Sequence, residues 1–133
     1  MTNQIILDLN KSFKTLNDPI KLRQGETAVE IQAMITENSK VYNLNGLTAE
    51  LHIKKPNAEV YIEKTTIKDN KIICNLNNDV LTVPGKAKAY FQLNGSNFMV
   101  TTETFNLQIL RGLTPVKKKD ENEPQPVDLQ MLI

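Results

Sequence analysis

One histidine, His52, and one cysteine, Cys74, set the limits of the reaction chemistry open to this sequence. Nucleophilic or general-base catalysis needs a polarised pair within reach, most often His with Ser or Cys. The alternation of apolar and polar residues along the chain places His52 on the solvent side of an expected strand. Cys74 has the same parity as the apolar residues Ile72 and Leu76, so we expect it to be a small buried thiol. A zinc site needs several His or Cys ligands, which one of each cannot supply. We therefore expect no catalytic residue and no metal site.

The acidic residues and the glycines add no recognisable site. The glutamates fall about one per expected strand or turn and form no Asp-rich loop of the calcium-binding type, so we expect them to be solvated charges. They include Glu26, Glu30, Glu50, Glu59, Glu63 and Glu103. None of the five glycines stands in a G-x-G-x-x-G or G-x-x-x-x-G-K arrangement that would cradle phosphates. We expect no nucleotide and no other cofactor.

The bulk composition argues against a nucleic-acid-binding protein and against a membrane protein. A chain of 133 residues fits one domain. Lys and Arg (16) nearly balance Asp and Glu (15), so the net charge of +1 gives no field that would collect phosphate backbones. The N-terminus has a brief apolar run at residues 5–7, without the basic leader or the long apolar stretch of a targeting or membrane segment. A single cysteine fits folding in a reducing cytosol. We expect no nucleic-acid partner and no membrane partner.

Apolar and polar residues alternate through most of the chain, which is typical of half-buried strands. The apolar sets expected to face a core are Val29, Ile31, Ala33 and Ile35; Leu47, Ala49, Leu51 and Ile53; Val60 and Ile62; Ile72, Cys74 and Leu76; and Ala87, Ala89, Phe91 and Leu93. Together with residues 4–9 they predict an all-β fold, an Ig-like antiparallel β-sandwich of about seven to eight strands. With one cysteine and no tryptophan it is not an antibody-type domain.

Turn residues separate these segments. Residues 68–71 (Lys-Asp-Asn-Lys) predict one turn, and residues 94–97 (Asn-Gly-Ser-Asn) predict a hairpin because they tolerate positive φ. On the return strand, at about 98–110, Phe98 and Val100 have one parity and Phe105, Leu107 and Ile109 the other. A bulge or bend near 101–104 would reconcile the two halves.

The composition changes after Gly112. The charged, proline-containing stretch 117–126 has nothing apolar to bury, so we expect a solvated linker and a domain boundary near residue 113. The division is then a sandwich over residues 1–113 and a flexible C-terminal tail over residues 114–133. The last residues are apolar again, and we expect Val127, Leu129, Met131, Leu132 and Ile133 to contact a partner.

Five stretches resemble, in order, the N-terminal domain family of the phage baseplate upper protein, found in siphophages of Gram-positive hosts. They are residues 20–26, with Arg23, Gln24 and Gly25; residues 44–49, with Gly46; residues 53–57, with Pro56; residues 83–91, with Gly85; and residues 101–107, with Thr101 and Phe105. The resemblance spans about residues 4–110. For each named residue we expect a structural role in a turn or in the core, without ligand contact.

The resemblance implies a non-enzymatic structural module of the tail baseplate. Such a module docks in several copies on the distal tail protein at the hub, links it to receptor-binding proteins and so serves host attachment. It implies a homo-oligomer in a virion assembled in the bacterial cytoplasm.

Two alternatives remain open. A carbohydrate- or host-receptor-binding β-sandwich is disfavoured, because only Tyr42, Tyr61, Tyr90 and four Phe are available as aromatic platforms. A hydrolase or a protease inhibitor has no support beyond the size of the chain.

Overall fold

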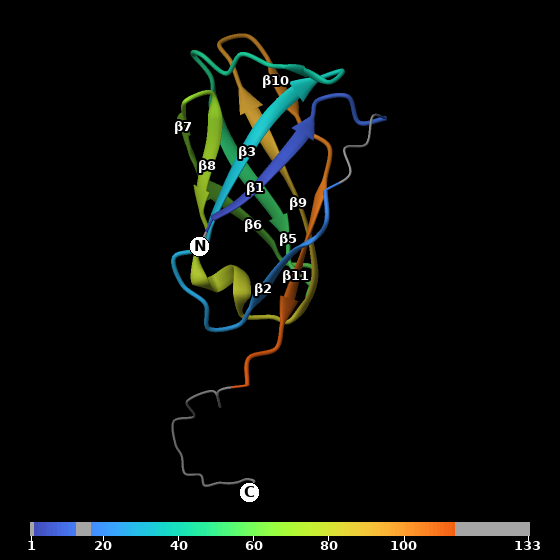
Figure 1. Ribbon diagram of the computed structural model, residues 1–133, viewed down its shortest axis with the longest axis vertical. Helices are drawn as coiled ribbons and strands as arrows, with labels where there is room; N and C mark the ends of the chain where they lie inside the picture. The colour runs from blue at the N-terminus through green and yellow to red at the C-terminus, as the bar shows by residue number, and fades with distance from the viewer. Residues whose placement is uncertain (1, 13–16, 114–133) are drawn as a thin grey trace, which may run out of the picture.

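Two β-sheets stacked face to face make up the protein, in a computed structural model that describes residues 2–12 and 17–113 (Figure 1). The prediction of an all-β sandwich is confirmed. The predicted linker and the apolar tail at Val127, Leu129, Met131, Leu132 and Ile133 lie outside the described residues.

The first sheet has five strands in the order β1-β3-β8-β7, with β4 pairing β3. Their bounds are β1 Thr2–Asp8, β3 Glu30–Glu37, β4 Lys40–Val41, β7 Thr66–Lys68 and β8 Lys71–Asn75. The second sheet has six strands in the order β2-β11-β9-β5-β6, with β10 pairing β9. Their bounds are β2 Ile20–Arg23, β5 Thr48–Lys54, β6 Val60–Lys64, β9 Gly85–Asn94, β10 Met99–Thr101 and β11 Phe105–Leu110. A short 3-10 helix, η1 Asn78–Leu81, joins β8 to β9.

The strand count and the strand directions differ from the prediction of an antiparallel sandwich of seven to eight strands. The described residues form eleven strands, because the sequence did not predict the short strands β2, β4 and β7, of four, two and three residues, and because the one expected return strand is divided into β10 and β11. Two pairs are parallel, β1 with β3 and β2 with β11. The chain leaves the first sheet after β1, forms β2 in the second and returns as β3, so β3 runs in the same direction as β1. Alternation reports which face a residue occupies and carries no information on strand direction.

The core lies between the sheets and is built as predicted from the alternating apolar sets of β3, β5, β8 and β9. Phe91 and Phe105 stack there with ring centroids 5.7 Å apart. The prediction was wrong for Val60 and Ile62, which are 68% and 54% exposed. In the register of β6 on β5, Tyr61 lies opposite buried Ile53, so Tyr61 shares the inward face and packs against the core.

Both predicted turns are present. At residues 68–71, Asp69 and Asn70 take positive φ (54° and 56°). At residues 94–97 no residue has a positive φ, and glycine is needed at position 95 for a different reason, because a Cβ there would collide with the ring of Phe98.

The predicted irregularity in the return strand is confirmed. Residues 102–104 lie opposite only residues 90 and 91 of β9, so the strand carries one extra residue between β10 and β11. Thr102 holds this bulge, because its hydroxyl accepts from the Phe91 amide at 3.1 Å and its own amide donates to the Phe91 carbonyl at 3.0 Å.

Candidate partner-binding surface

The structure keeps His52 and Cys74 apart. Cys74 faces the core from the first sheet, and burial, with a smaller effect from the charge of Glu63, raises the pKa of its thiol to about 12. His52 lies on the outer face of the second sheet, stacked on Tyr90 with centroids 5.3 Å apart and with Nε2 3.4 Å from Glu50 Oε1. Among the residues that the structure describes, no group of three or more His, Cys, Asp or Glu is placed to hold a metal ion.

One acidic residue expected to be solvated is buried. Glu103 is 9% exposed because it lies in the bulge, where its Oε2 accepts from the Asp8 amide at 2.8 Å and its own amide donates to the Asp8 carbonyl at 2.9 Å. The reason is positional, since the bulge at 102–104 turns Glu103 from the solvent side toward the end of β1.

Asp8 itself is fully buried and was not singled out by the sequence. Its Oδ1 accepts from the amides of Asn10 (2.8 Å) and Asn38 (3.0 Å). Its Oδ2 accepts from the Ser39 amide (2.9 Å) and the Thr36 hydroxyl (2.7 Å). Burial by itself would raise the pKa of Asp8, but these hydrogen bonds stabilise the charged form and lower its pKa to about 2. The carboxylate ties β1 to the turn between β3 and β4, which is a structural role.

Unpaired charge gathers instead on the outer face of the second sheet. A hollow of about 470 Å³ lies there over β5, β9 and β11; we call it the lysine hollow. Its lining residues are Pro19, Lys54, Lys55, Pro56, Ala58, Lys86, Lys88, Asn106, Leu107 and Gln108. In the sheet register, Lys54 lies opposite Lys88, Lys88 opposite Asn106, and Lys86 opposite Gln108. The lining therefore combines four ammonium groups and two amides with no carboxylate.

The four lysines are not equivalent. Lys55 is 8% exposed, and its Nζ donates to Thr82 Oγ1 at 3.2 Å and lies 3.4 Å from Glu59 Oε1. Lys54, Lys86 and Lys88 are exposed and form no ion pair with any residue of the described part of the chain. Three charges therefore remain available to a partner.

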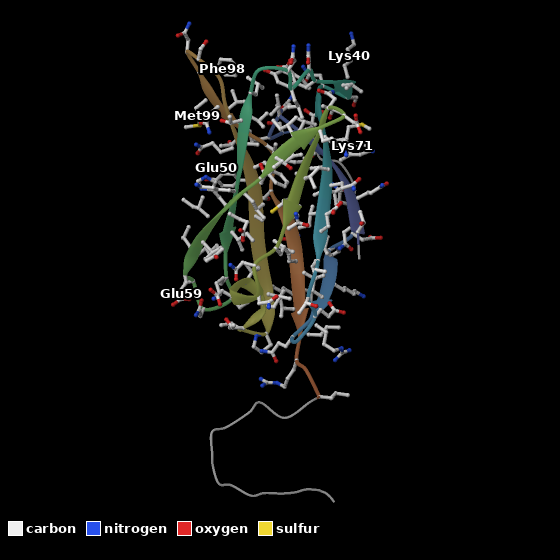
Figure 2. All side chains as sticks on the ribbon, turned by 90° about the vertical axis from the view of Figure 1, so that its left-hand side faces the viewer. Lys40, Glu50, Glu59, Lys71, Phe98 and Met99 are labelled. Atoms are coloured by element: carbon white, nitrogen blue, oxygen red, sulfur yellow. The ribbon has the colours of Figure 1, made fainter. Side chains whose placement is uncertain are left out.

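An apolar strip borders the lysine hollow. It consists of Val60 and Ile62 on edge strand β6, the residues whose exposure the sequence did not predict. Val60 lies opposite Lys54, and Ile62 lies opposite His52, which stacks on Tyr90. We call this pair the β6 strip. Figure 2 shows this side of the sandwich with Glu50 and Glu59 projecting from it, while Lys40 and Lys71 project from the opposite side.

Two of the residues on which the resemblance rests, Pro56 and Gly85, lie at the lysine hollow. Gly85 has φ 128°, and a Cβ on it would lie 3.0 Å from the Cβ of Pro56, which lines the hollow. Gln24 Nε2 donates to the Thr82 carbonyl at 2.8 Å, and Gln24 Oε1 accepts from the Gly112 amide at 3.1 Å. Because Lys55 also contacts Thr82, these side chains connect the turns at Gln24 and Pro56.

The remaining residues of the resemblance are distributed over the fold. Arg23 donates from Nη1 to the Arg111 carbonyl at 2.8 Å, and Gly25 has φ 94° in the adjacent turn. Gly46 has φ 82° in the turn before β5. Thr101 ends β10, and Phe105 is buried at 4% exposure. The structure therefore brings Arg23, Gln24 and Gly25 together and joins Pro56 to Gly85, whereas Gly46, Thr101 and Phe105 belong to other turns and the core.

Nothing among the described helices has the length and apolar character needed to cross a membrane.

Comparison with known proteins finds a family that the sequence matches and solved structures that have a similar fold. The sequence matches the model of a family described as "BppU N-terminal domain" over residues 1–133. Eleven chains of solved structures are similar. Among them, a structure described as the N-terminal domain of phage TP901-1 ORF48 aligns with a TM-score of 0.65 and 22% identity, over 83% of this chain and 99% of that one. No curated protein matches the sequence.

Proposed function

Since the chain belongs to the BppU N-terminal domain family and is thus a structural domain of a phage baseplate, we propose that it docks on the distal tail hub. In this role it links the hub to further baseplate proteins or to receptor-binding proteins. Family membership gives its location as the virion tail; assembly takes place in the host cytoplasm.

The observation that carries the docking role is the outer face of the second sheet. The β6 strip exposes Val60 and Ile62 on an edge strand, beside three lysines without ion pairs. Exposed apolar side chains at a sheet edge are a natural pairing surface, and assembly proteins use such edges for strand addition. The burial of this strip in a complex would stabilise that complex by removing apolar area from water.

The proposed role involves no catalysis. His52 is stacked on Tyr90 beside Glu50 on the outer face of the second sheet, whereas Cys74 is a protonated thiol that faces the core from the first sheet, so the two do not form a base–nucleophile pair. The residues Arg23, Gln24, Gly25, Gly46, Pro56, Gly85, Thr101 and Phe105 act through turns and packing.

We further propose that residues 1–113 are the folding unit and that residues 114–133 are a tether. The apolar residues of 127–133 then contact a partner or a second copy. Removal of residues 127–133 should leave the thermal unfolding midpoint unchanged, because every strand that the structure describes lies within residues 2–110, while self-association measured by light scattering falls. Unfolding of the shortened chain would contradict the boundary at residue 113.

Co-expression with the distal tail protein of the same phage tests the docking role. Light scattering of the purified chain alone and of the co-expressed pair should show a ring-like complex that contains several copies of each protein. A glycan-array signal with no such complex would contradict the proposal and favour a carbohydrate-binding module.

A further inference from the structure

Three of the four lysines of the lysine hollow, Lys54, Lys86 and Lys88, form no ion pair with any residue that the structure describes. Lys54 and Lys88 are direct cross-strand partners on the same face of neighbouring strands. Lys86 lies two residues before Lys88 on β9 and therefore also on this face. Like charges directly opposite one another on a sheet are destabilising. An added row of carboxylates would relieve this repulsion.

The rest of the lining indicates the kind of partner. Asn106 and Gln108 supply amides that both donate and accept hydrogen bonds, as an extended backbone requires, and Pro19, Pro56 and Ala58 supply small apolar contacts. The lining contains no arginine, which forms two-pronged contacts with phosphate, and no aromatic ring on which a base would stack. These features favour a peptide over a nucleic acid.

We propose that the lysine hollow binds an extended acidic segment of a partner protein, with side-chain carboxylates between Lys54, Lys86 and Lys88 and the backbone against Asn106 and Gln108. The inference rests on the proposed docking function and adds the chemical character of the partner, an acidic peptide segment. Lys55 also lines the hollow, but its ammonium group already contacts Thr82 and Glu59, so it is not one of the lysines that bind the segment.

NMR titration of the full chain with an octaglutamate peptide tests the proposal. We expect the amide signals of Lys54, Lys86, Lys88 and Asn106 to shift, and the binding to weaken as salt is raised. The combined variant Lys54→Glu, Lys86→Glu and Lys88→Glu should bind at least roughly tenfold more weakly, because three exposed ion pairs are lost.

A matched variant, Lys40→Glu, Lys68→Glu and Lys71→Glu, makes the same charge change on the opposite sheet and should leave the affinity within about twofold of the unmodified chain. An equal loss in both variants, or no shift at the named amides, would overturn the proposal. Tighter binding of a short oligothymidylate at the same amides would also overturn it, in favour of a phosphate site.

The result also separates this inference from the docking role. If the chain assembles with the distal tail protein but neither binds octaglutamate nor responds to the lysine changes, the acidic partner is wrong and docking stands. If octaglutamate binds in the hollow and no assembly forms, the binding site stands and docking on the hub is wrong.

Discussion

Two charged sites in this protein, the buried carboxylate of Asp8 and the three exposed lysines of the lysine hollow, are organised in opposite ways. Asp8 is fully buried, and its two carboxylate oxygens accept four hydrogen bonds. Lys54, Lys86 and Lys88 are exposed, lie close together and have no ion-pair partner within the described residues. A buried charge is tolerated only when its hydrogen bonds are satisfied, whereas an exposed charge is tolerated without a partner.

The contrast separates stability from recognition. The Asp8 network links β1, the β3–β4 turn and the bulge, so its removal should act on folding. The three exposed lysines Lys54, Lys86 and Lys88 form no ion pair among the described residues, so their replacement should act on binding alone. Four predictions test this division, in order of the free-energy change expected.

Replacement of Asp8 by alanine should lower the free energy of unfolding by about 3 kcal/mol, because four donors lose a charged acceptor at a buried position. Urea denaturation measures the change. Asp18→Ala serves as the control, since Asp18 is exposed, and should change the stability by less than about 0.5 kcal/mol. Equal effects of the two substitutions would remove the basis of the comparison.

Acid should destabilise the protein through Asp8. The pKa of Asp8 is about 2 in the folded protein, against an ordinary value of 3.8 for an aspartate, so the folded state favours the ionised form. The stability from this group is therefore fully present above about pH 4 and is lost as the pH falls through about 2, with a total on the order of 2 kcal/mol. Urea midpoints measured across this range should fall in the unmodified chain. The Asp8→Asn variant should lack this component, and identical pH profiles would contradict the assignment.

Gly85→Ala should cost about 2 kcal/mol, because the residue combines φ 128° with a Cβ position 3.0 Å from Pro56. Gly25→Ala is the matched control, with φ 94° and no atom within 4 Å of the added Cβ, and should cost about 1 kcal/mol. Thermal unfolding measures both. A larger loss for Gly25→Ala would show that contact with Pro56 does not restrain the rim of the lysine hollow.

Neutralising the hollow should have the smallest effect on stability. The combined change of Lys54, Lys86 and Lys88 to Gln should leave the free energy of unfolding unchanged or raise it by up to about 0.5 kcal/mol, because like-charge repulsion is removed. A fall of more than about 1 kcal/mol in urea denaturation would mean that these lysines have partners in the fold and are not free for recognition.

Local alternation predicted most of the core but not the features that depend on tertiary register. It placed Ile31, Ala33 and Phe91 inside, as the structure confirms. It placed Val60 and Ile62 inside as well, because apolar character was the only signal, whereas the register on β5 turns Tyr61 inward.

The two charge sites depended still more on distant contacts. Asp8 is buried by residues 28 to 31 positions away in β3 and the turn after it, and by Glu103, 95 positions away. Lys54 has the same parity as His52, which alternation placed toward solvent, but the pairing of Lys54 with Lys88 exists only in the folded sheet. The parallel pairing of β1 with β3 and of β2 with β11 could not be predicted either, because alternation indicates only which face of a sheet a residue occupies.

Hydrogen exchange on this protein, alone and in complex with the distal tail protein, tests the central claim most directly. The claim predicts slower exchange on complex formation at residues 52–62 and 86–90, with no change at residues 36–40 beside Asp8. Protection confined to residues 36–40, with the outer face of the second sheet unchanged, would contradict it.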